Sequence, residues 1–223
     1  MKNSVREVFA AAAESYDHGN PLLQIEREET AALLPILSGQ AVLDLGAGRG
    51  HYASFAHAQG AARAVALDLT PEMLAGAPRP ALVADAAALP LTDGCIDVVV
   101  AALMLSYVSD RGKALSEAAR VLRPGGTLVL SDLHPVATAR GWRRSFEDGA
   151  GRPVIARAAP PTLVEVRRHL GDAGLTVEAQ REPVVDERLR TAFHRAGRPD
   201  FAVLYGTPLL ALFRARKGGS HAG

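Results

Sequence analysis

The sequence has a single cysteine, Cys95, among its 223 residues. One cysteine excludes a disulfide framework and any metal cluster built from several cysteines, so no metal site is predicted. No charge sign dominates, because the formal net charge is +1 at pH 7. Overall charge therefore gives no reason to expect nucleic acid or a membrane surface as a partner. The basic clusters at 140–144 (RGWRR) and 214–217 (RARK) are interpreted as solvated surface charge.

Long apolar runs are missing as well. The longest, Val98–Leu105, is far shorter than a membrane span. The first residues, MKNSVREVF, carry charges where a signal peptide needs an apolar core. These features predict a cytoplasmic protein. The length predicts a single domain over 1–223, and the 48% hydrophobic fraction is sufficient for a full core.

The stretch 41–50, AVLDLGAGRG, is the feature around which the sequence is organised. It predicts a buried strand over 41–45, a tight turn, and the first turn of a helix. Glycine tolerates positive φ and lets a ligand lie against bare backbone, and a helix start offers unpaired N–H groups. Such turns occur in nucleotide sites of several kinds and also as plain tight turns. The residues that follow must therefore decide between these possibilities.

Strands and helices alternate along most of the chain. Strands are predicted at 41–45, 64–67, 81–84, 96–101, 127–130, 174–178 and 208–213. Helices are predicted at 2–14, 22–37, 50–59, 110–122 and 161–173, and a further helix is expected to begin at Thr70-Pro71. This alternation favours βαβ units and a parallel sheet.

Three of the predicted strands are followed by an acid, namely Asp44, Asp68 and Asp85. Ligands of open α/β sheets bind at the carboxyl edge, where these acids should gather. Several carboxylates along one edge suit a ligand with hydroxyl and amino donors better than a chain of phosphates. The segments 133–160 and 184–206 show no clean periodicity, and we expect them to be insertions that cap the substrate. Residues 1–37 are expected to form an N-terminal helical lid.

Several motifs follow one another in order: VLDLGAGRG (42–50), VALDLTPEML (65–74), ADAAALPLTDGCIDVVVA (84–101) and EAARVLRPGGTLVLSD (117–132). Together they resemble the class I S-adenosylmethionine-dependent methyltransferases, most closely the small-molecule branch with the ubiquinone/menaquinone-type enzymes. The resemblance covers about 16–132. It implies a doubly wound, Rossmann-like α/β fold with a seven-stranded sheet, mostly parallel with an antiparallel last strand, and helices on both faces.

The same resemblance implies a role for each matching residue toward S-adenosylmethionine. Asp44 and the glycines would hold the methionine part, Asp68 the ribose hydroxyls, and Asp85 with the Ala86 amide the adenine. Tyr16 would close over the cofactor. The full set of expected cofactor-binding residues is Tyr16, Asp44, Gly46, Gly48, Gly50, Asp68, Leu69, Met73, Asp85, Ala86 and Ala101.

The residues for the methyl acceptor are expected after the fourth and fifth strands. His134 is the candidate general base, and Ser106, Tyr107 and Trp142 are candidate substrate contacts. The family often has histidine at the position of Ser106, and its absence weakens the case for a base there. The expected acceptor is a small molecule, with O-methylation favoured and C- or N-methylation of a quinone or another metabolite as the alternative. The protein is expected to be a monomer or homodimer.

Other functions fit the residues less well. A nicotinamide-dependent enzyme would show G-x-G-x-x-G, whereas the spacing here is G-x-G-x-G and His51 follows. The Asn/Asp-Pro-Pro and Pro-Cys motifs of nucleic-acid methyltransferases are missing, since the fourth strand is followed by Ala-Ala-Leu-Met. A protein substrate stays open, as does a non-methylating or binding role of the same fold.

Overall fold

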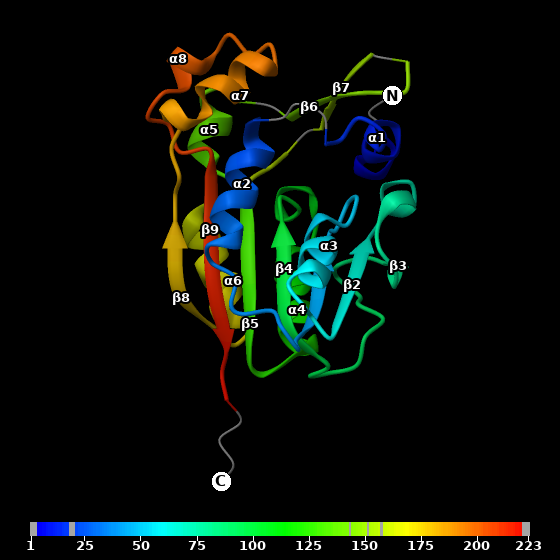
Figure 1. The fold of residues 1–223 in the computed structure, drawn as a ribbon. Helices are drawn as coiled ribbons and strands as arrows, with labels where there is room; N and C mark the ends of the chain where they lie inside the picture. The colour runs from blue at the N-terminus through cyan, green and yellow to red at the C-terminus, as the bar shows by residue number, and fades with distance from the viewer. Residues whose placement is uncertain (1–3, 18–20, 143, 151, 157, 220–223) are drawn as a thin grey trace.

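The computed structural model describes residues 4–17, 21–142, 144–150, 152–156 and 158–219. Seven strands form one sheet in the order β3-β2-β1-β4-β5-β9-β8 (Figure 1). Their bounds are β1 (Ala41–Leu45), β2 (Arg63–Asp68), β3 (Ala81–Val83), β4 (Ile96–Ala102), β5 (Leu122–Leu133), β8 (Leu175–Arg181) and β9 (Leu210–Lys217). Within this sheet β9 alone runs antiparallel to its neighbours. The predicted fold class is confirmed.

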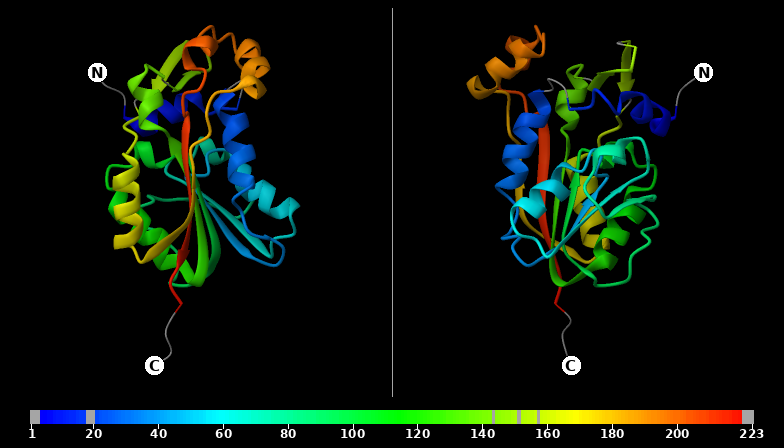
Figure 2. Two further views of the ribbon diagram at one scale, coloured as in Figure 1. Left: turned by 90° about the vertical axis from the view of Figure 1, so that its left-hand side faces the viewer. Right: turned by 45° about the vertical axis from the view of Figure 1, so that its right-hand side comes forward.

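Helices cover both faces of the sheet (Figure 2). One face carries α4 (Arg111–Val121) and α6 (Leu163–Asp172), and the other carries α2 (Pro21–Ala31) and α3 (His51–Ala58). The central strands are therefore buried on both sides. In β4, Val98 and Val99 point to opposite faces and expose 2% and 0% of their surface. This explains why β4 is apolar without alternation.

The remaining elements gather at the carboxyl ends of the parallel strands (Figure 1). They are α1 (Val5–Ala12), α5 (Pro135–Ala139), the hairpin of β6 (Arg144–Glu147) and β7 (Pro153–Ala156), α7 (Arg190–Arg195) and α8 (Phe201–Leu204). The segments 133–160 and 184–206 showed no periodicity because their α-helices and strands are only four to six residues long. The 3-10 turn η3 (Glu187–Leu189) also lies here. Segment 184–206 therefore contains the short helices α7 and α8 despite its lack of periodicity.

Two predicted helices are shorter than expected. The helix predicted at 22–37 ends at Ala31, because Pro35 has no N–H and disfavours helical backbone at the residue before it. The helix expected from Thr70-Pro71 is only the 3-10 turn η1 (Met73–Gly76), followed by Pro78 and Pro80. Residues 2 and 3 of the helix predicted at 2–14 lie outside the described residues.

The last strand is longer than predicted. It extends to Lys217, so the basic cluster 214–217 belongs to the sheet. Arg214 Nε and Arg216 Nε lie 3.0 and 2.6 Å from the two carboxylate oxygens of Glu178 on β8. Alternating basic residues on β9 thus face an acid on the neighbouring strand, which stabilises pairing across the sheet.

Candidate active site

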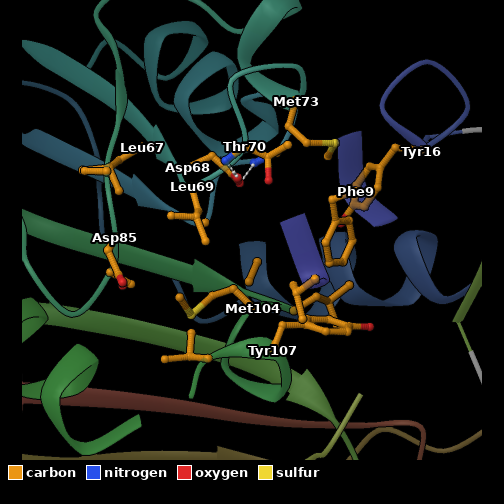
Figure 3. Close-up of a pocket in the computed structure, with 18 of the residues that line it drawn as sticks. Phe9, Tyr16, Leu67, Asp68, Leu69, Thr70, Met73, Asp85, Met104 and Tyr107 are labelled. Atoms are coloured by element: carbon orange, nitrogen blue, oxygen red, sulfur yellow. Dashed lines mark hydrogen bonds between the residues drawn. The ribbon is translucent and has the colours of Figure 1, made fainter. Parts of the chain in front are cut away.

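A cavity opens at the carboxyl ends of β1, β2 and β4, beneath α1 (Figure 3). It encloses about 820 Å³, counting the space at its open mouth, which is in the range of small-molecule sites. Its walls combine the loops after β1, β2, β3 and β4 with α1 and with Tyr16, which follows α1 in the chain. The lining residues are Val5, Phe9, Tyr16, Gly46, Gly48, Leu67, Asp68, Leu69, Thr70, Met73, Ala84, Asp85, Ala86, Ala102, Leu103, Met104, Tyr107, Val108 and Ser109.

The glycine-rich turn presents bare backbone to this cavity. Gly46 and Gly48 have φ of +69° and +53°, a region that favours glycine. A Cβ built on Gly46 would lie 2.6 Å from Met104 Cβ, so a side chain cannot be accommodated there. The turn is anchored on β2, because Gly46 N donates to the Leu67 carbonyl at 2.8 Å.

Asp44 supports the turn from behind and does not line the cavity. Its carboxylate accepts a hydrogen bond from Ala53 N in α3 at 2.9 Å. Only 2% of Asp44 is exposed, and this burial raises its pKa to about 8. Asp44 therefore fixes the angle between β1 and α3, and the expectation that it touches the cofactor has no support in this geometry.

Asp68 lies at the end of β2 with its carboxylate in the cavity (Figure 3). One oxygen accepts from Gly48 N at 2.8 Å and the other from Thr70 N at 2.9 Å. Burial raises its pKa, and these backbone donors oppose the rise. The carboxylate thus couples the glycine turn to the loop after β2, and lone pairs stay available for a ligand.

Asp85 follows β3 and faces the same cavity as Asp68 (Figure 3). Its Oδ1 accepts from Ala87 N at 2.8 Å, which fixes the side chain in the loop. Leu69 lies between the two acids and is 46% exposed, whereas Met73 is buried. An apolar floor with an acid at each end suits a flat heterocycle joined to a sugar. The donor and acceptor set therefore fits S-adenosylmethionine.

Two other expected cofactor residues lie outside the lining. Ala101 is 1% exposed inside the sheet, and its neighbour Ala102 lines the cavity instead. Because side chains alternate along a strand, a shift of one residue changes the face. Gly50 has φ of +77° at the start of α3 and is required for the turn rather than for contact with the cavity.

The candidate base His134 lies away from the cavity. It is 4% exposed and caps α5: its Nδ1 accepts from Val136 N at 3.2 Å, and its Nε2 lies 3.3 Å from Glu182 Oε2. Both ring nitrogens are thus occupied by structural contacts. His134 is not among the cavity-lining residues, so this geometry does not support the expectation of a catalytic His134.

Of the three expected acceptor contacts, only Tyr107 lines the cavity. Ser106 is buried, and its Oγ donates to Asp132 Oδ1 at 2.5 Å. Trp142 packs against Phe193, and the Arg198 guanidinium lies 4.1 Å from its ring centroid. In this structure Ser106 and Trp142 are parts of the framework.

Sequence reasoning missed Val5 and Phe9 of α1 and also Arg144. The cluster 140–144 was interpreted as surface charge, yet Arg144 is 2% exposed and its Nη2 donates to the Tyr16 hydroxyl at 2.8 Å. That interpretation is wrong for Arg144. The available signal was the two-residue spacing to Phe146, which places both side chains on one face of β6.

No helix in the described ranges has both the length and the apolarity needed to cross a membrane. Likewise, the described part of the chain contains no group of three or more His, Cys, Asp or Glu side chains arranged to hold a metal ion.

Comparison with known proteins bears directly on this site. Residues 43–130 match the family model described as "Methyltransferase domain". The chain is 35% identical over 182 residues to a malonyl-[acyl-carrier protein] O-methyltransferase of Pectobacterium atrosepticum, covering 76% of this chain and 70% of that relative. It is 33% identical to a demethylmenaquinone methyltransferase of Clavibacter sepedonicus, covering 73% and 68%.

A solved structure has the same fold. The S-adenosylmethionine-dependent methyltransferase from Mesorhizobium loti superimposes with a TM-score of 0.68 at 26% identity, covering 86% of this chain and 97% of that one. The matched sequence includes the glycine turn and both acids that face the cavity. The chain therefore belongs to the class I S-adenosylmethionine-dependent methyltransferases.

Proposed function

We propose that this enzyme methylates an oxygen atom of a small-molecule acceptor. The observation that carries the proposal is the single cavity that Asp68 and Asp85 share with an aromatic wall formed by Phe9 and Tyr107. The acids suit the nucleoside part of the cofactor, and the aromatic wall suits an acceptor beside it. One relative is named as an O-methyltransferase, which supports oxygen as the accepting atom.

S-adenosylmethionine, when bound, supplies a methyl group on a positively charged sulfur. The residues of the chain orient it: Asp68 accepts from the ribose hydroxyls, and Asp85 and the Ala86 amide hold the adenine. Leu69 and Met73 pack against the ring. Gly46 and Gly48 leave room for the methionine part, and Tyr16 closes the cavity from the N-terminal side. Alignment of the nucleophile and exclusion of water then provide most of the rate enhancement.

The lining contains no histidine or lysine among the described residues. Asp68 is engaged by two backbone donors, and Asp85 lies at the adenine end. A general base is required only for an acceptor that is protonated at the working pH. We therefore propose an acceptor whose oxygen already carries negative charge or loses its proton readily.

Transfer of tritium from methyl-labelled S-adenosylmethionine to a cell extract tests this proposal. After separation by size, label in the small-molecule fraction is the expected result, and an Asp68→Ala variant should leave that fraction unlabelled. Label confined to protein or nucleic acid would contradict a small-molecule acceptor. An absence of any label would contradict the methylating role itself.

A further inference from the structure

Arg144 is a buried cation for which the described part of the chain shows no ion pair within 4.0 Å, although its charge acts on the buried Asp132. Its side chain is 2% exposed. Burial raises the pKa of Asp132 and the positive charge of Arg144 opposes that rise, but this carboxylate already accepts hydrogen bonds from Ser106 N and Oγ and from Leu133 N. The guanidinium donates to the Tyr16 hydroxyl at 2.8 Å and to the Leu103 carbonyl at 3.4 Å, and its Nε makes no hydrogen bond with any side chain or backbone that the structure describes.

The hydroxyl of Tyr107 is a second unsatisfied group at the same place. This oxygen is buried and makes no hydrogen bond of 3.5 Å or less among the described residues, although the nearby Arg144 guanidinium opposes the rise in its pKa that burial causes. The Arg144 Cζ lies 5.9 Å from the centroid of the Tyr107 ring and 5.2 Å from that of Tyr16. Both tyrosines line the cofactor cavity, so Arg144 contacts two lining rings although it does not line the cavity itself.

Burying a charged group without a partner is costly, as is leaving a buried hydroxyl unbonded. Tyr107 lies on the opposite side of Met104 from Asp85 (Figure 3), and the Arg144 guanidinium lies 5.9 Å from the centroid of the Tyr107 ring. A ligand with one negative charge and two acceptor oxygens satisfies both: one oxygen accepts from the guanidinium and the other from the phenol. A carboxylate has this chemistry.

We propose that Arg144 and Tyr107 bind the carboxylate of the methyl acceptor, so that the product is a methyl ester. The inference rests on the proposed function and names the acceptor class. Binding replaces the contact of the guanidinium with a neutral phenol, Tyr16, by a contact with an anion.

The reaction balances without a base. A carboxylate oxygen forms a bond to the methyl carbon while the carbon–sulfur bond breaks, and the bonding electron pair stays on sulfur. The negative acceptor and the positive sulfonium become a neutral ester and a neutral thioether, and no proton moves. This agrees with a cavity in which no histidine or lysine was found among the described residues. Loss of the charge also weakens the contact with Arg144, which favours release of the ester.

A purely structural role for Arg144 would be to hold the Tyr16 and Phe146 rings, which it contacts at 5.2 and 5.1 Å from their centroids. The two roles differ in what Tyr107→Phe does. That substitution removes an oxygen without a hydrogen-bond partner and leaves the ring contact with Phe9 in place. A structural role predicts no change in transfer, whereas carboxylate binding predicts a loss of about tenfold or more.

The experiment uses methyl-tritiated S-adenosylmethionine and the small-molecule fraction of a cell extract, with label counted before and after mild alkali. Methyl esters release volatile tritiated methanol under these conditions, whereas ethers and N- or C-methyl groups keep the label. Wild type, Arg144→Met, Tyr107→Phe and the control Arg152→Met are compared, since Arg152 is an exposed arginine of the same hairpin loop, paired with Asp148. Affinity for S-adenosylhomocysteine is measured for each variant.

We expect alkali-labile label from wild type and Arg152→Met, a loss of about tenfold or more in the other two variants, and unchanged cofactor affinity in Tyr107→Phe. Alkali-stable label would overturn the carboxylate inference while leaving methyl transfer to a small molecule intact. Unchanged labelling by Tyr107→Phe would also overturn it, even if Arg144→Met failed to fold. Failure of wild type to label any small molecule would instead contradict the proposed function.

Discussion

At the scale of single residues, environment gives two similar acids different tasks. Asp44 and Asp68 lie near the carboxyl ends of the neighbouring strands β1 and β2, where the register pairs Asp44 with Ala66. Asp44 is enclosed behind the glycine turn, whereas Asp68 reaches into the cavity. Both side chains point to the face that α3 covers, so the difference follows from their position along the strands: Asp44 lies beneath α3, whereas Asp68 is the last residue of β2. Substitution of Asp68 should therefore affect cofactor binding, whereas substitution of Asp44 should affect how stability depends on pH.

Asp68→Ala should weaken S-adenosylhomocysteine binding by at least about tenfold, because a charged acceptor of two hydroxyl donors is lost. It also removes the acceptor for Gly48 N and Thr70 N, so the free energy of unfolding should fall by about 1–3 kcal/mol. Isothermal titration calorimetry and urea denaturation measure the two effects. Asp172→Ala, on the exposed surface of α6, serves as the control. An unchanged dissociation constant would remove Asp68 from the cofactor site.

Asp44→Asn should change how stability depends on pH. Burial raises the pKa of Asp44 from 3.8 to about 8, so between these values the native state holds a proton that the unfolded state releases. The unfolded state then binds fewer protons, and the free energy of unfolding falls as pH rises through this window. The amide can still accept from Ala53 N but does not titrate. Relative to the variant, the wild type should therefore lose stability from about pH 4 to pH 8. Parallel denaturation curves at pH 5 and 8 would contradict the raised pKa.

At the scale of elements, predictability depended on length and repetition. The strands β1, β2 and β4 and the helices α4 and α6 were predictable because each carries a full period of apolar residues or a clear end signal. The elements at the carboxyl edge were not, because α5, β6, β7, α7 and α8 are too short to show a period.

The residues of the site divide in the same way, into those that belong to local motifs and those that do not. Gly46, Gly48, Asp68, Leu69, Met73, Asp85 and Ala86 were placed by their motifs and do line the cavity, although their contacts with the cofactor stay a prediction. The acceptor side was predicted poorly because it depends on long-range packing. Arg144 reaches Tyr16 across 128 residues of sequence, a contact that no local pattern encodes.

A matched pair of glycine substitutions tests the account of the turn. Gly46→Ala should lower the free energy of unfolding by about 2–4 kcal/mol, because its φ is positive and a Cβ would lie 2.6 Å from Met104 Cβ. Gly171→Ala in α6 should raise it by about 0.5 kcal/mol, since nothing lies within 4 Å of its Cβ position and alanine favours helix. Urea denaturation at one pH compares the two. Equal effects would show that the turn tolerates a side chain.

At the scale of the whole molecule, the loops after the sheet strands form the cofactor side of the cavity. Helix α1 and Tyr16 form the part of the wall that lies outside the sheet. Helix α1 is joined to the β6–β7 hairpin by an aromatic cluster. The Phe9 and Tyr107 rings meet edge to face at 5.0 Å, and the Tyr16 and Phe146 rings stack at 5.3 Å. Because Phe9, Tyr16 and Tyr107 also line the cavity, the cap and the cofactor site share side chains. Binding of a ligand in the cavity should therefore reduce local opening in α1 and β6, which are distant from the glycine turn in sequence.

Hydrogen exchange measures this coupling. Addition of S-adenosylhomocysteine should slow amide exchange in α1 and in β6, because a ligand against Phe9 and Tyr16 holds the aromatic cluster in place and lowers the frequency of local opening. Helix α6 packs on the sheet away from the cavity and should exchange at the same rate with and without ligand. In a Phe9→Ala variant the protection of α1 should disappear while that of the glycine turn persists, since the turn is held by β2 through Leu67 and Asp68. Protection confined to the glycine turn in the wild type would show that α1 is not a lid over the cofactor.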